Sequence, residues 1–462
     1  MAAMTYPDAL AYLYSLTNYE RSDPPRDTQR ALDLERMRAV LAALGNPHER
    51  YKTIHVAGTK GKGSTAAMID ACLRQLGLRV GLFTSPHLTT FRERIRVNGA
   101  LISQEEVVDL TQRMQSIAEH IPGITTFEAV TAMGFLYFAQ RDVDWAVIEV
   151  GLGGRLDATN VITPQVSVIT SISLDHTRWL GNTLAEIAAE KAGIIKPGVP
   201  VVSQQQATEA MAVIERTAHE RNAPLAMLGR HWRWTPGLTT LEKQTFEVKQ
   251  VARVRSNERP YVNDLEGWYE TTLLGKHQCE NATTAIAALD VLRNSGSIDI
   301  SARAIRDGLR ATFWPGRFEI LRAHPPLILD GAHNVDSVNK LAMTLAEVFP
   351  GRRWTFIFGC YQDKDAEGML KALAGRAVRW IMTQPGNSRA MPVEQLLDIA
   401  RARNLKTTAF PTVKEAMNAV ANTAEAVCIT GSIALVGEAR AAWGIGGTGA
   451  GIDVDPSVLN RT

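Results

Sequence analysis

One stretch of the chain, TIHVAGTKGKGST at residues 53–65, has the composition of a loop that binds phosphate. Three glycines interrupt it and an apolar helical run follows it, so that a strand, a glycine-rich loop and a helix succeed one another. Backbone N–H groups of such a loop can turn toward an anion, and the helix N-terminus adds its positive dipole end. Lys62 would bring a point charge to the terminal phosphates. The stretch predicts a nucleotide site, and the alternative is a glycine-rich turn with an accidental lysine.

The loop departs from the common pattern G-x-x-x-x-G-K-[ST] at two positions. Val56 stands where that pattern has its first glycine, and Gly63 stands where it has a hydroxyl residue. The hydroxyl comes one place later, at Ser64. The side chain that usually binds Mg²⁺ beside the lysine is therefore missing, and we expect Mg²⁺ to be held mostly by other parts of the chain.

Apolar segments that alternate between strand and helix spacing indicate a mainly parallel sheet covered on both faces. Residues 227–274 change to alternating apolar and β-branched positions, which predicts a small antiparallel portion. Residues 313–317, FWPGR, predict a domain boundary because they contain proline and glycine. We therefore expect an α/β protein with an ATP-binding domain at 1–314 and a smaller, Rossmann-like α/β domain at 315–462.

Besides the strand before the glycine loop, strands are expected at 79–84, 144–150, 166–171, 199–203, 327–330, 354–359, 379–383 and 427–430. Helices are expected at 27–45, 107–120, 128–140, 184–192, 207–221, 281–292 and 335–348.

Reactive side chains fall at the carboxyl ends of the expected strands, where parallel sheets bind ligands. They are, in chain order, Ser85, His87, Glu149, Asp175 and His176. Glu149 is the strongest metal candidate because a carboxylate in an apolar strand is costly to bury unless it is paired or binds a cation. The alternative for Glu149 is a buried salt bridge. Ser85 could equally be a turn residue before proline, and His176 could equally hydrogen-bond a carbonyl.

Four further features allow more than one interpretation. The GLGG segment at 151–154 does not continue as a dinucleotide fingerprint, because Leu156 stands where the third glycine is needed. Lys191, on the expected helix at 184–192, would by itself be a solvated surface lysine. The segment DGAHN at 330–334 opens a helix, and capping explains one of its polar residues but not all. Arg317 could reach a phosphate when the domains close, or form a salt bridge in the linker.

The composition is that of an ordinary folded protein. The chain has 462 residues, 45% of them hydrophobic and 21% charged, with a net charge of +2, so nothing indicates disorder or a broad surface for nucleic acid or anionic membranes. The four cysteines are scattered, without the spacing of a metal site or a disulfide framework. We recognise no targeting or membrane-spanning segment. A cytoplasmic protein that binds neither nucleic acid nor membrane is expected.

Eight stretches in chain order together resemble the folylpolyglutamate synthase/dihydrofolate synthase family, a branch of the Mur-type ATP-dependent amide ligases. They are AGTKGKGST (57–65), FTSPHLTTFRERIRVNG (83–99), IEVGLGGRLDATNVI (148–162), LDHTRWLGNTLAEIAAEKAGIIKPG (174–198), GKHQCENATTAIAAL (275–289), WPGRFE (314–319), LILDGAHNVDS (327–337) and TGSIALVGEAR (430–440). The resemblance covers nearly the whole chain. It implies a domain like the central domain of Mur ligases, followed by a Mur-type C-terminal domain.

The resemblance also implies a reaction. The carboxylate of a reduced folate or of dihydropteroate attacks the γ-phosphate of ATP to give an acyl phosphate, and the amine of L-glutamate then displaces phosphate. ATP and two Mg²⁺ ions are the implied cofactors, and a monomer suffices because two domains form the site. Dihydrofolate synthase and folylpolyglutamate synthase activity are not separated. A Mur-type ligase for a non-folate acid and a non-catalytic nucleotide-binding protein remain as alternatives.

The same resemblance implies roles for individual residues. The nucleotide positions are Gly58, Thr59, Lys60, Gly61, Lys62, Gly63, Ser64, Asn281, Arg317 and Asp330. The metal ligands are Ser85, Glu149 and His176, and the catalytic positions are Lys62, Lys191, His176, Arg317 and His333. Lys191 matches a family lysine that is carbamylated, which turns a cation into an anion beside the metals. The residues near the folate are Phe127, Glu128, His87 and Arg94. Lys60 replaces the asparagine that is common in the family loop.

Overall fold

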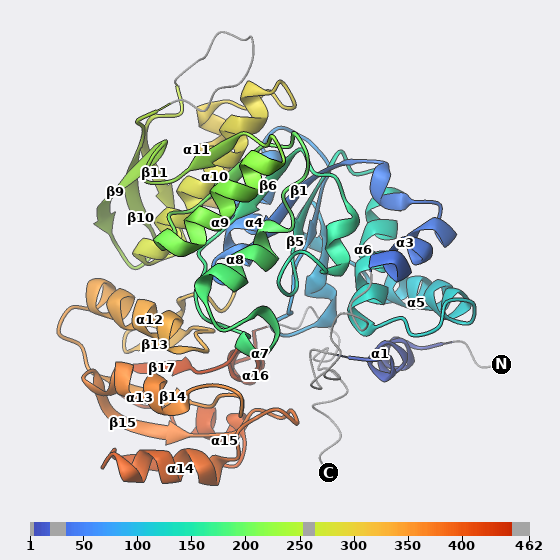
Figure 1. Ribbon diagram of the computed structural model, residues 1–462. Helices are drawn as coiled ribbons and strands as arrows, with labels where there is room; N and C mark the ends of the chain where they lie inside the picture. Colours follow the sequence, from blue (N-terminus) through green and yellow to red (C-terminus); the bar gives the residue numbers. More distant parts are fainter. Residues whose placement is uncertain (1–3, 19–33, 253–263, 446–462) are drawn as a thin grey trace.

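The structure, a computed structural model, describes residues 4–18, 34–252 and 264–445. Two α/β domains face each other, the first drawn from blue to yellow and the C-terminal one in orange and red (Figure 1). The first has a mostly parallel sheet and a small antiparallel sheet, and the second has a sheet of its own. The predicted fold class is therefore confirmed. Residues 27–33 of the expected helix at 27–45 lie outside the described residues, and the rest of that helix runs over Leu34–Ala43.

The main sheet of the first domain has eight strands. They are β1 (Lys52–Ala57), β2 (Val80–Phe83), β3 (Ile95–Val97), β4 (Ala100–Leu101), β5 (Trp145–Glu149), β6 (Val166–Ile169), β7 (Val201–Ser203) and β8 (Leu225–Met227). Their order across the sheet is β4-β3-β2-β5-β1-β6-β7-β8. The strands from β2 to β8 in this order are parallel, and β3 and β4 form an antiparallel edge. Strand β1 thus lies in the middle, between β5 and β6.

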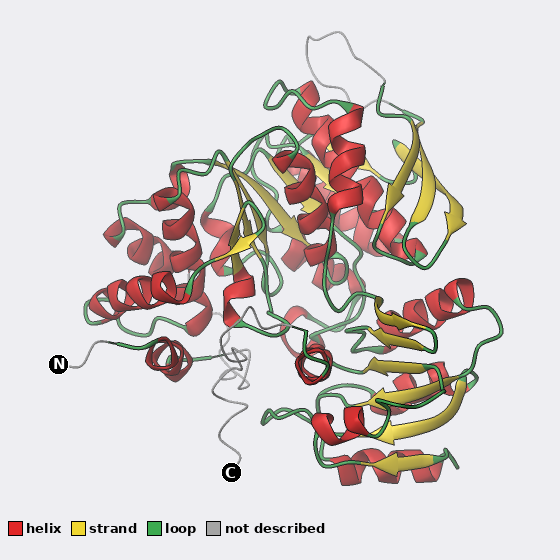
Figure 2. Ribbon diagram, turned by 180° about the vertical axis from the view of Figure 1, so that it is seen from behind, coloured by secondary structure: helices red, strands yellow, loops and turns green. Residues whose placement is uncertain are grey.

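Helices cover both faces of this sheet (Figure 2). They are α1 (Tyr6–Ser15), α3 (Leu34–Ala43), α4 (Lys62–Arg74), α5 (Gln104–Ala118), α6 (Thr126–Gln140), α7 (Thr177–Leu180), α8 (Leu184–Ala192), α9 (Thr208–Glu220), α10 (Lys276–Asn294) and α11 (Ala302–Ala311), with short 3-10 turns at Pro47–Glu49, Phe91–Arg94 and Ala158–Val161. Several begin with a capping box, in which a Ser or Thr and an acidic residue three positions later bind each other's backbone N–H. Local sequence therefore sets where these helices start.

The small antiparallel sheet consists of β9 (Trp232–Thr239), β10 (Gln244–Gln250) and β11 (Gly267–Thr271) in the order β11-β10-β9. Its buried side chains Trp232, Phe246 and Tyr269 belong to the same core as Ile286 of α10 and Ile305 of α11. The antiparallel portion predicted for residues 227–274 is therefore present, and residues 253–263 within it lie outside the description.

The C-terminal domain is a six-stranded sheet with helices on its faces. Its strands are β12 (Glu319–Ala323), β13 (Pro326–Leu329), β14 (Trp354–Phe358), β15 (Ala377–Met382), β16 (Thr407–Ala409) and β17 (Val427–Thr430), in the order β12-β13-β17-β14-β15-β16. Its helices are α12 (Val335–Val348), α13 (Ala366–Ala374), α14 (Val393–Ala402), α15 (Val413–Asn418) and α16 (Ile433–Ala442). All neighbouring strands are parallel except β12, which forms an antiparallel pair with β13.

Some elements are absent from the sequence-based expectations. The antiparallel strands β3 and β4 have only three and two residues, and β12 is half-buried at every position, so it has no alternating pattern to detect. Helix α10 starts at Lys276, five residues before the expected start at 281, because Gly275 is its N-cap. Within the described ranges, no helix is long and apolar enough to cross a membrane.

Candidate active site

Four adjacent strands bring the predicted groups to one place. Ser85 follows β2, Glu149 ends β5, the phosphate loop with Lys62 follows β1, and His176 follows β6. These strands are neighbours in the order β2-β5-β1-β6, so their carboxyl ends share one edge of the sheet. A cleft with a volume of about 1750 Å³ opens there, between the first domain and the C-terminal domain. Every site residue that the sequence predicts lines this cleft.

The phosphate loop leads directly into α4. The N–H groups of Lys62, Gly63 and Ser64 lie in the first turn of this helix, where the helix itself supplies no acceptor. Gly61, the N-cap, has a φ of 88°, and a Cβ there would lie 2.4 Å from Oδ1 of Asn281. The loop therefore requires glycine at this position, and it presents backbone donors of the kind that hold an anion.

The first half of the loop is bound to the protein instead. The N–H groups of Thr59 and Lys60 both donate to the carbonyl of Ser171, over 2.8 and 3.1 Å. The side chain of Lys60 also turns to a protein partner, because its Nζ lies 2.6 Å from Oδ2 of Asp175. In this arrangement, the donors available to a phosphate come from the helix turn and from Lys62 rather than from Thr59 and Lys60.

The missing hydroxyl at position 63 has a steric explanation. A Cβ on Gly63 would lie 3.1 Å from Nε1 of Trp314, a residue of the linker between the domains. The guanidinium of Arg96 lies over the Trp314 ring, 5.3 Å from its centre. Gly63 therefore leaves room for the linker, and a serine or threonine at this position would require the Trp314 ring to shift.

Two lysines converge on one carbonyl behind the loop. Nζ of Lys191 donates to the carbonyl of Gly58 over 2.9 Å, and Nζ of Lys62 donates to the same oxygen over 3.2 Å. Lys191 is buried, with 3% of its surface exposed. Burial, together with the nearby charge of Lys62, lowers the pKa of Lys191 to about 7. Lys191 is therefore no solvated surface lysine.

Glu149 is buried at the cleft and accepts a hydrogen bond from the N–H of Ser85 over 3.1 Å. Burial raises the pKa of its carboxyl group, although the charge of Lys62 acts in the opposite direction. Among the residues that the structure describes, none forms an ion pair with this carboxylate. A buried salt bridge, the alternative considered from the sequence, therefore does not explain why Glu149 is buried. A buried carboxylate of this kind fits a divalent cation.

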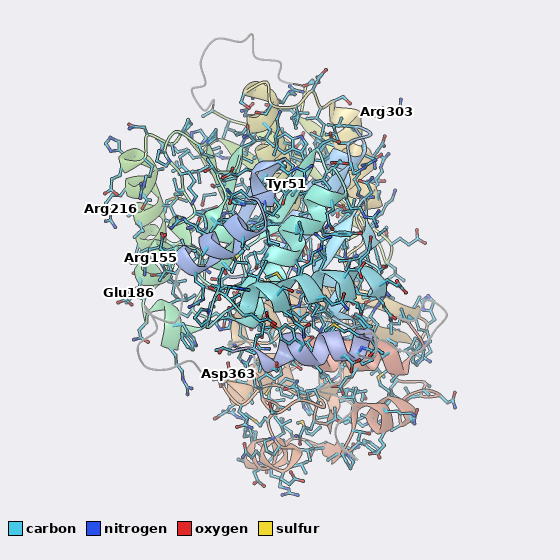
Figure 3. All side chains as sticks on the ribbon, turned by 90° about the vertical axis from the view of Figure 1, so that its right-hand side faces the viewer. Tyr51, Arg155, Glu186, Arg216, Arg303 and Asp363 are labelled. Carbon is cyan, nitrogen blue, oxygen red and sulfur yellow. The ribbon has the colours of Figure 1, made fainter. Side chains whose placement is uncertain are left out.

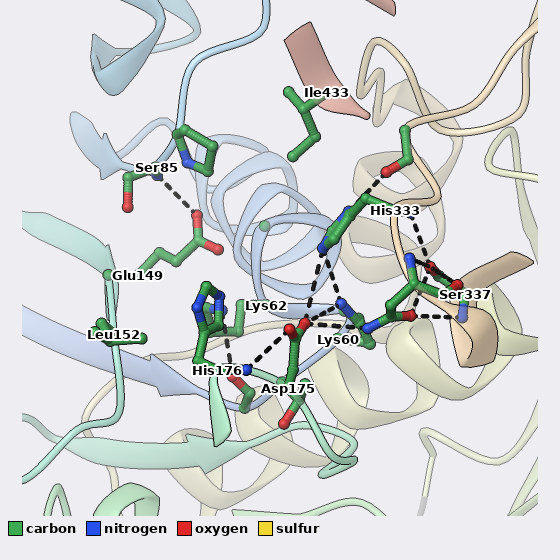
Figure 4. A pocket seen from close by; sticks show the side chains of 18 of the residues that line it. Lys60, Lys62, Ser85, Glu149, Leu152, Asp175, His176, His333, Ser337 and Ile433 are labelled. Atoms are coloured by element: carbon green, nitrogen blue, oxygen red, sulfur yellow. Dashed lines mark hydrogen bonds and ion pairs between the residues drawn. The ribbon is translucent and has the colours of Figure 1, made fainter. Parts of the chain in front are cut away.

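His176 lies on the same side of the cleft as Glu149 and Lys62 (Figure 4). Burial and the charges of nearby lysines lower the pKa of its imidazole to about 4. The neutral ring keeps a lone pair for a metal. Among the described residues, no three His, Cys, Asp or Glu side chains are grouped as a metal site. A cation bound here would therefore take further ligands from water and phosphate, as Mg²⁺ usually does.

The residues predicted to lie near the folate also line the cleft. The ring of Phe127 packs on Gly151, where a Cβ would lie 2.4 Å from Cζ. Nε of Arg94 donates to Nδ1 of His87 over 2.9 Å. Glu128 has a structural role, because both of its oxygens accept hydrogen bonds from Nε of Arg36, over 3.0 and 2.9 Å.

Asn281 and Asp330 both line the cleft, and Asn281 lies beside the phosphate loop, since its Oδ1 would be 2.4 Å from a Cβ on Gly61. Oδ1 of Asn281 accepts a hydrogen bond from Nε2 of Gln204, and its Nδ2 donates to Oε1 of Gln278, both over 2.9 Å. This pair of contacts sets the orientation of the Asn281 amide. Asp330 accepts hydrogen bonds from the N–H groups of Phe318 and Ala332, and burial raises the pKa of its carboxyl group.

Arg317 and His333 enter the cleft from the linker and the C-terminal domain. A Cβ on Gly331 would lie 2.6 Å from Nη1 of Arg317, so the absence of a side chain at Gly331 leaves space for the guanidinium. Nε2 of His333 lies 2.9 Å from Nζ of Lys60. The sequence placed Asp175 at a strand end and Asn334 in the DGAHN segment, but it gave neither a role, and it gave Lys364 no role either. Asn334 and Lys364 contact Asp175 from 159 and 189 positions away along the chain, so local pattern does not reveal these contacts.

The domains and the cleft define a class of protein, the Mur-type ATP-dependent ligases. Residues 56–289 match the family described as Mur ligase middle domain, and residues 316–433 match the Mur ligase glutamate ligase domain. A dihydrofolate synthase/folylpolyglutamate synthase of Bacillus subtilis is 38% identical over 88% of this chain and 94% of that protein. The chain belongs to the folylpolyglutamate synthase/dihydrofolate synthase family.

Solved structures agree with this assignment. The folylpolyglutamate synthase of Mycobacterium tuberculosis, complexed with ADP and AMPPCP, matches with a TM-score of 0.81 and 32% identity over 95% of this chain and 99% of that one. A folylpolyglutamate synthase in complex with AMPPCP and folate matches with a TM-score of 0.76 and 32% identity over 95% of this chain and 99% of that one. The predicted family is therefore confirmed.

Proposed function

We propose that this chain uses ATP to join L-glutamate to the carboxylate of a folate or pteroate, through an acyl phosphate. The observation that supports this most directly is the cleft between the domains. It combines a phosphate loop, a buried Glu149 without a described ion-pair partner, and residues from the C-terminal domain. A reaction that passes through a reactive acyl phosphate needs such a closed site, because water would destroy the intermediate.

In this proposal, Lys62 and the N–H groups of the first turn of α4 hold the phosphates. Arg317 and His333 approach the transferred phosphoryl group from the opposite side of the cleft. Asn281 and Asp330 contact the base and the ribose. The protein thus acts mainly by positioning the reactants and by neutralising charge on the phosphoryl group.

Glu149, Ser85 and His176 would hold the magnesium ions in this proposal. Their donors fit, since Glu149 is a buried carboxylate and His176 is neutral at physiological pH. Bound Mg²⁺ would supply positive charge to the phosphate oxygens. We also propose that Lys191 is carbamylated, because its ammonium is buried beside the positive charge of Lys62.

The finer assignments rest on the resemblance and on the placement of residues. Phe127, His87 and Arg94 would contact the folate, whereas Glu128 would act by holding Arg36 and the start of α6. We propose a cytoplasmic monomer with domains at 1–314 and 315–462, since one chain supplies both walls of the cleft.

The test is incubation with Mg-ATP and L-glutamate, offering dihydropteroate and tetrahydrofolate in separate reactions, with mass analysis of the products. We expect at least one acceptor to gain one glutamate unit, with ADP released in equal amount. Gain on dihydropteroate alone defines a dihydrofolate synthase, gain on tetrahydrofolate alone a folylpolyglutamate synthase, and gain on both a bifunctional enzyme. If neither acceptor changes, the folate assignment is wrong, and a non-folate Mur-type substrate becomes the leading candidate.

A further inference from the structure

A buried network of polar side chains joins the two domains at Asp175. From the first domain, Lys60 of the phosphate loop places Nζ 2.6 Å from Oδ2 of Asp175. From the C-terminal domain, Nζ of Lys364 donates to Oδ1 of Asp175 over 3.1 Å. Nδ2 of Asn334 donates to Oδ2, also over 3.1 Å. A single carboxylate thus receives donors from the phosphate loop, from the N-cap of α12 and from the loop before α13.

His333 completes the network, and its tautomer follows from its contacts. Nδ1 lies 2.9 Å from the carbonyl of Gly331, which can only accept, so Nδ1 carries the hydrogen. Nε2 is then an acceptor and receives a hydrogen bond from Nζ of Lys60 over 2.9 Å. Figure 4 shows Lys60 and His333 meeting at Asp175. The side chains of Lys60, Asp175 and Lys364 are 13%, 7% and 9% exposed, so solvent screens this network little.

We propose that Asp175 is a positioning residue that holds the C-terminal domain closed over the phosphate loop, through Lys364 and Asn334 on one side and Lys60 on the other. Asp175 would thus link the closed state to the arrangement of the loop that holds the nucleotide. The proposed function enters only through one of the two measurements, the rate of glutamate ligation.

The electrostatics of the closed arrangement explain why one residue has this effect. Lys60 and Lys364 are two cations that approach the same small volume from different domains, and they would repel each other without an anion between them. Asp175 is the carboxylate that both contact. Removing its charge takes away the carboxylate that both ammonium groups share, and Asp363 then compensates the charge of Lys364 alone, so the closed state is disfavoured relative to an open state in which both lysines reach water.

The chain contains a matched control for this effect. Asp363 also contacts Lys364, with its Oδ2 3.2 Å from Nζ, so it resembles Asp175 in charge and distance. Asp363, however, is in the C-terminal domain like Lys364 itself, and it also binds Arg389 there. It lies where that domain faces the first one (Figure 3). Neutralising Asp363 removes a contact with Lys364 but no contact between domains.

The first experiment compares Asp175→Asn with Asp363→Asn in the full-length protein. Asparagine keeps the shape and can still accept a hydrogen bond from the N–H of His176, so the fold should survive, which a thermal melt checks. We expect kcat for glutamate ligation to fall at least about tenfold in Asp175→Asn and less than about twofold in Asp363→Asn. The Kd for ADP should change less than about threefold in both, because the phosphate donors of the first domain remain.

Small-angle X-ray scattering with saturating AMPPCP provides a readout that does not depend on catalysis. The wild type and Asp363→Asn should become more compact with the nucleotide, and Asp175→Asn should stay expanded. Lys364→Met should reproduce the effect of Asp175→Asn, whereas Lys364→Arg should retain closure. The double variant Asp175→Asn/Lys364→Met should lose no more compaction than either single variant, because both substitutions break the same contact. Equal compaction of Asp175→Asn and wild type would overturn the proposal.

The outcomes separate this proposal from two others. If Asp175→Asn closes normally but raises KM for ATP, then Lys60 acts on the nucleotide directly and Asp175 is no closure residue. If the wild type ligates neither folate acceptor, the proposed function fails, while the scattering result still decides the role of Asp175.

Discussion

Lys191 offers the sharpest test of the chemistry in the cleft. Carbon dioxide reacts with a neutral amine, so the yield of carbamate depends on how much of the lysine is unprotonated. An ordinary lysine, with a pKa near 10.4, is neutral in about one molecule in a thousand at pH 7.5. Because burial and the charge of Lys62 lower the pKa of Lys191 to about 7, roughly three-quarters of this side chain is neutral at the same pH. The neutral, reactive form is thus several hundred times more abundant at Lys191 than at an ordinary lysine, which favours carbamylation there.

The expected result is a carbamate signal in ¹³C NMR spectra of the wild-type protein supplied with ¹³C-bicarbonate at pH 7.5. The signal should be lost in Lys191→Ala, together with ligase activity, and short carboxylic acids should restore part of that activity. Lys196→Ala is the matched control. Lys196 also has a pKa lowered by burial, to about 8, but its Nζ donates to the carbonyl of Asn160. This control should keep both the Lys191 carbamate and the activity.

The stability of carbon-dioxide-free protein gives a second measurement. The pKa of unmodified Lys191 is lower in the folded state than in the unfolded chain, so unfolding takes up a proton between about pH 7 and pH 10.5. The free energy of unfolding should therefore rise with pH across that window, by an amount on the order of 5 kcal/mol. In Lys191→Met the rise should be smaller by about that amount but not abolished, because Lys60 and Lys196, whose pKa values burial lowers to about 8, contribute in the same direction. Wild-type activity in Lys191→Ala without additive, or an unchanged ¹³C spectrum, would refute the reasoning.

Two further predictions concern the metal site and the phosphate loop. Glu149→Gln should abolish ADP release that depends on folate and glutamate while leaving the melting temperature equal or higher, because burial already disfavours the charged carboxylate. Full activity in that variant would remove Glu149 from the metal site. Gly63→Ser, which restores the common loop pattern, should lower the melting temperature and kcat, because a Cβ would lie 3.1 Å from Nε1 of Trp314. Gly63→Ala should show the same loss, and a gain of activity in Gly63→Ser would show that the hydroxyl matters more than the contact.

The sequence by itself determined the local parts of this protein. A glycine loop between a strand and a helix predicted a phosphate site, because N–H donors, φ above zero and the helix dipole are local properties. A carboxylate among apolar strand residues marked Glu149, because burying an unpaired charge is costly wherever the strand lies. The order of eight motifs indicated the family and hence the fold. The strand β12 was not predicted, because its side chains are half-buried at every position and show no alternation of buried and exposed residues.

Only the tertiary structure decided which of these parts meet. The strand order β2-β5-β1-β6 brings Ser85, Glu149 and His176 to the phosphate loop. Position 63 is crowded by Trp314, which lies far away in the sequence, so glycine is favoured there over the usual hydroxyl residue. The Asp175 network joins positions 115 and 189 residues apart. Residue type and periodicity record what one segment needs, whereas the partner that satisfies a buried charge depends on how distant segments pack against each other.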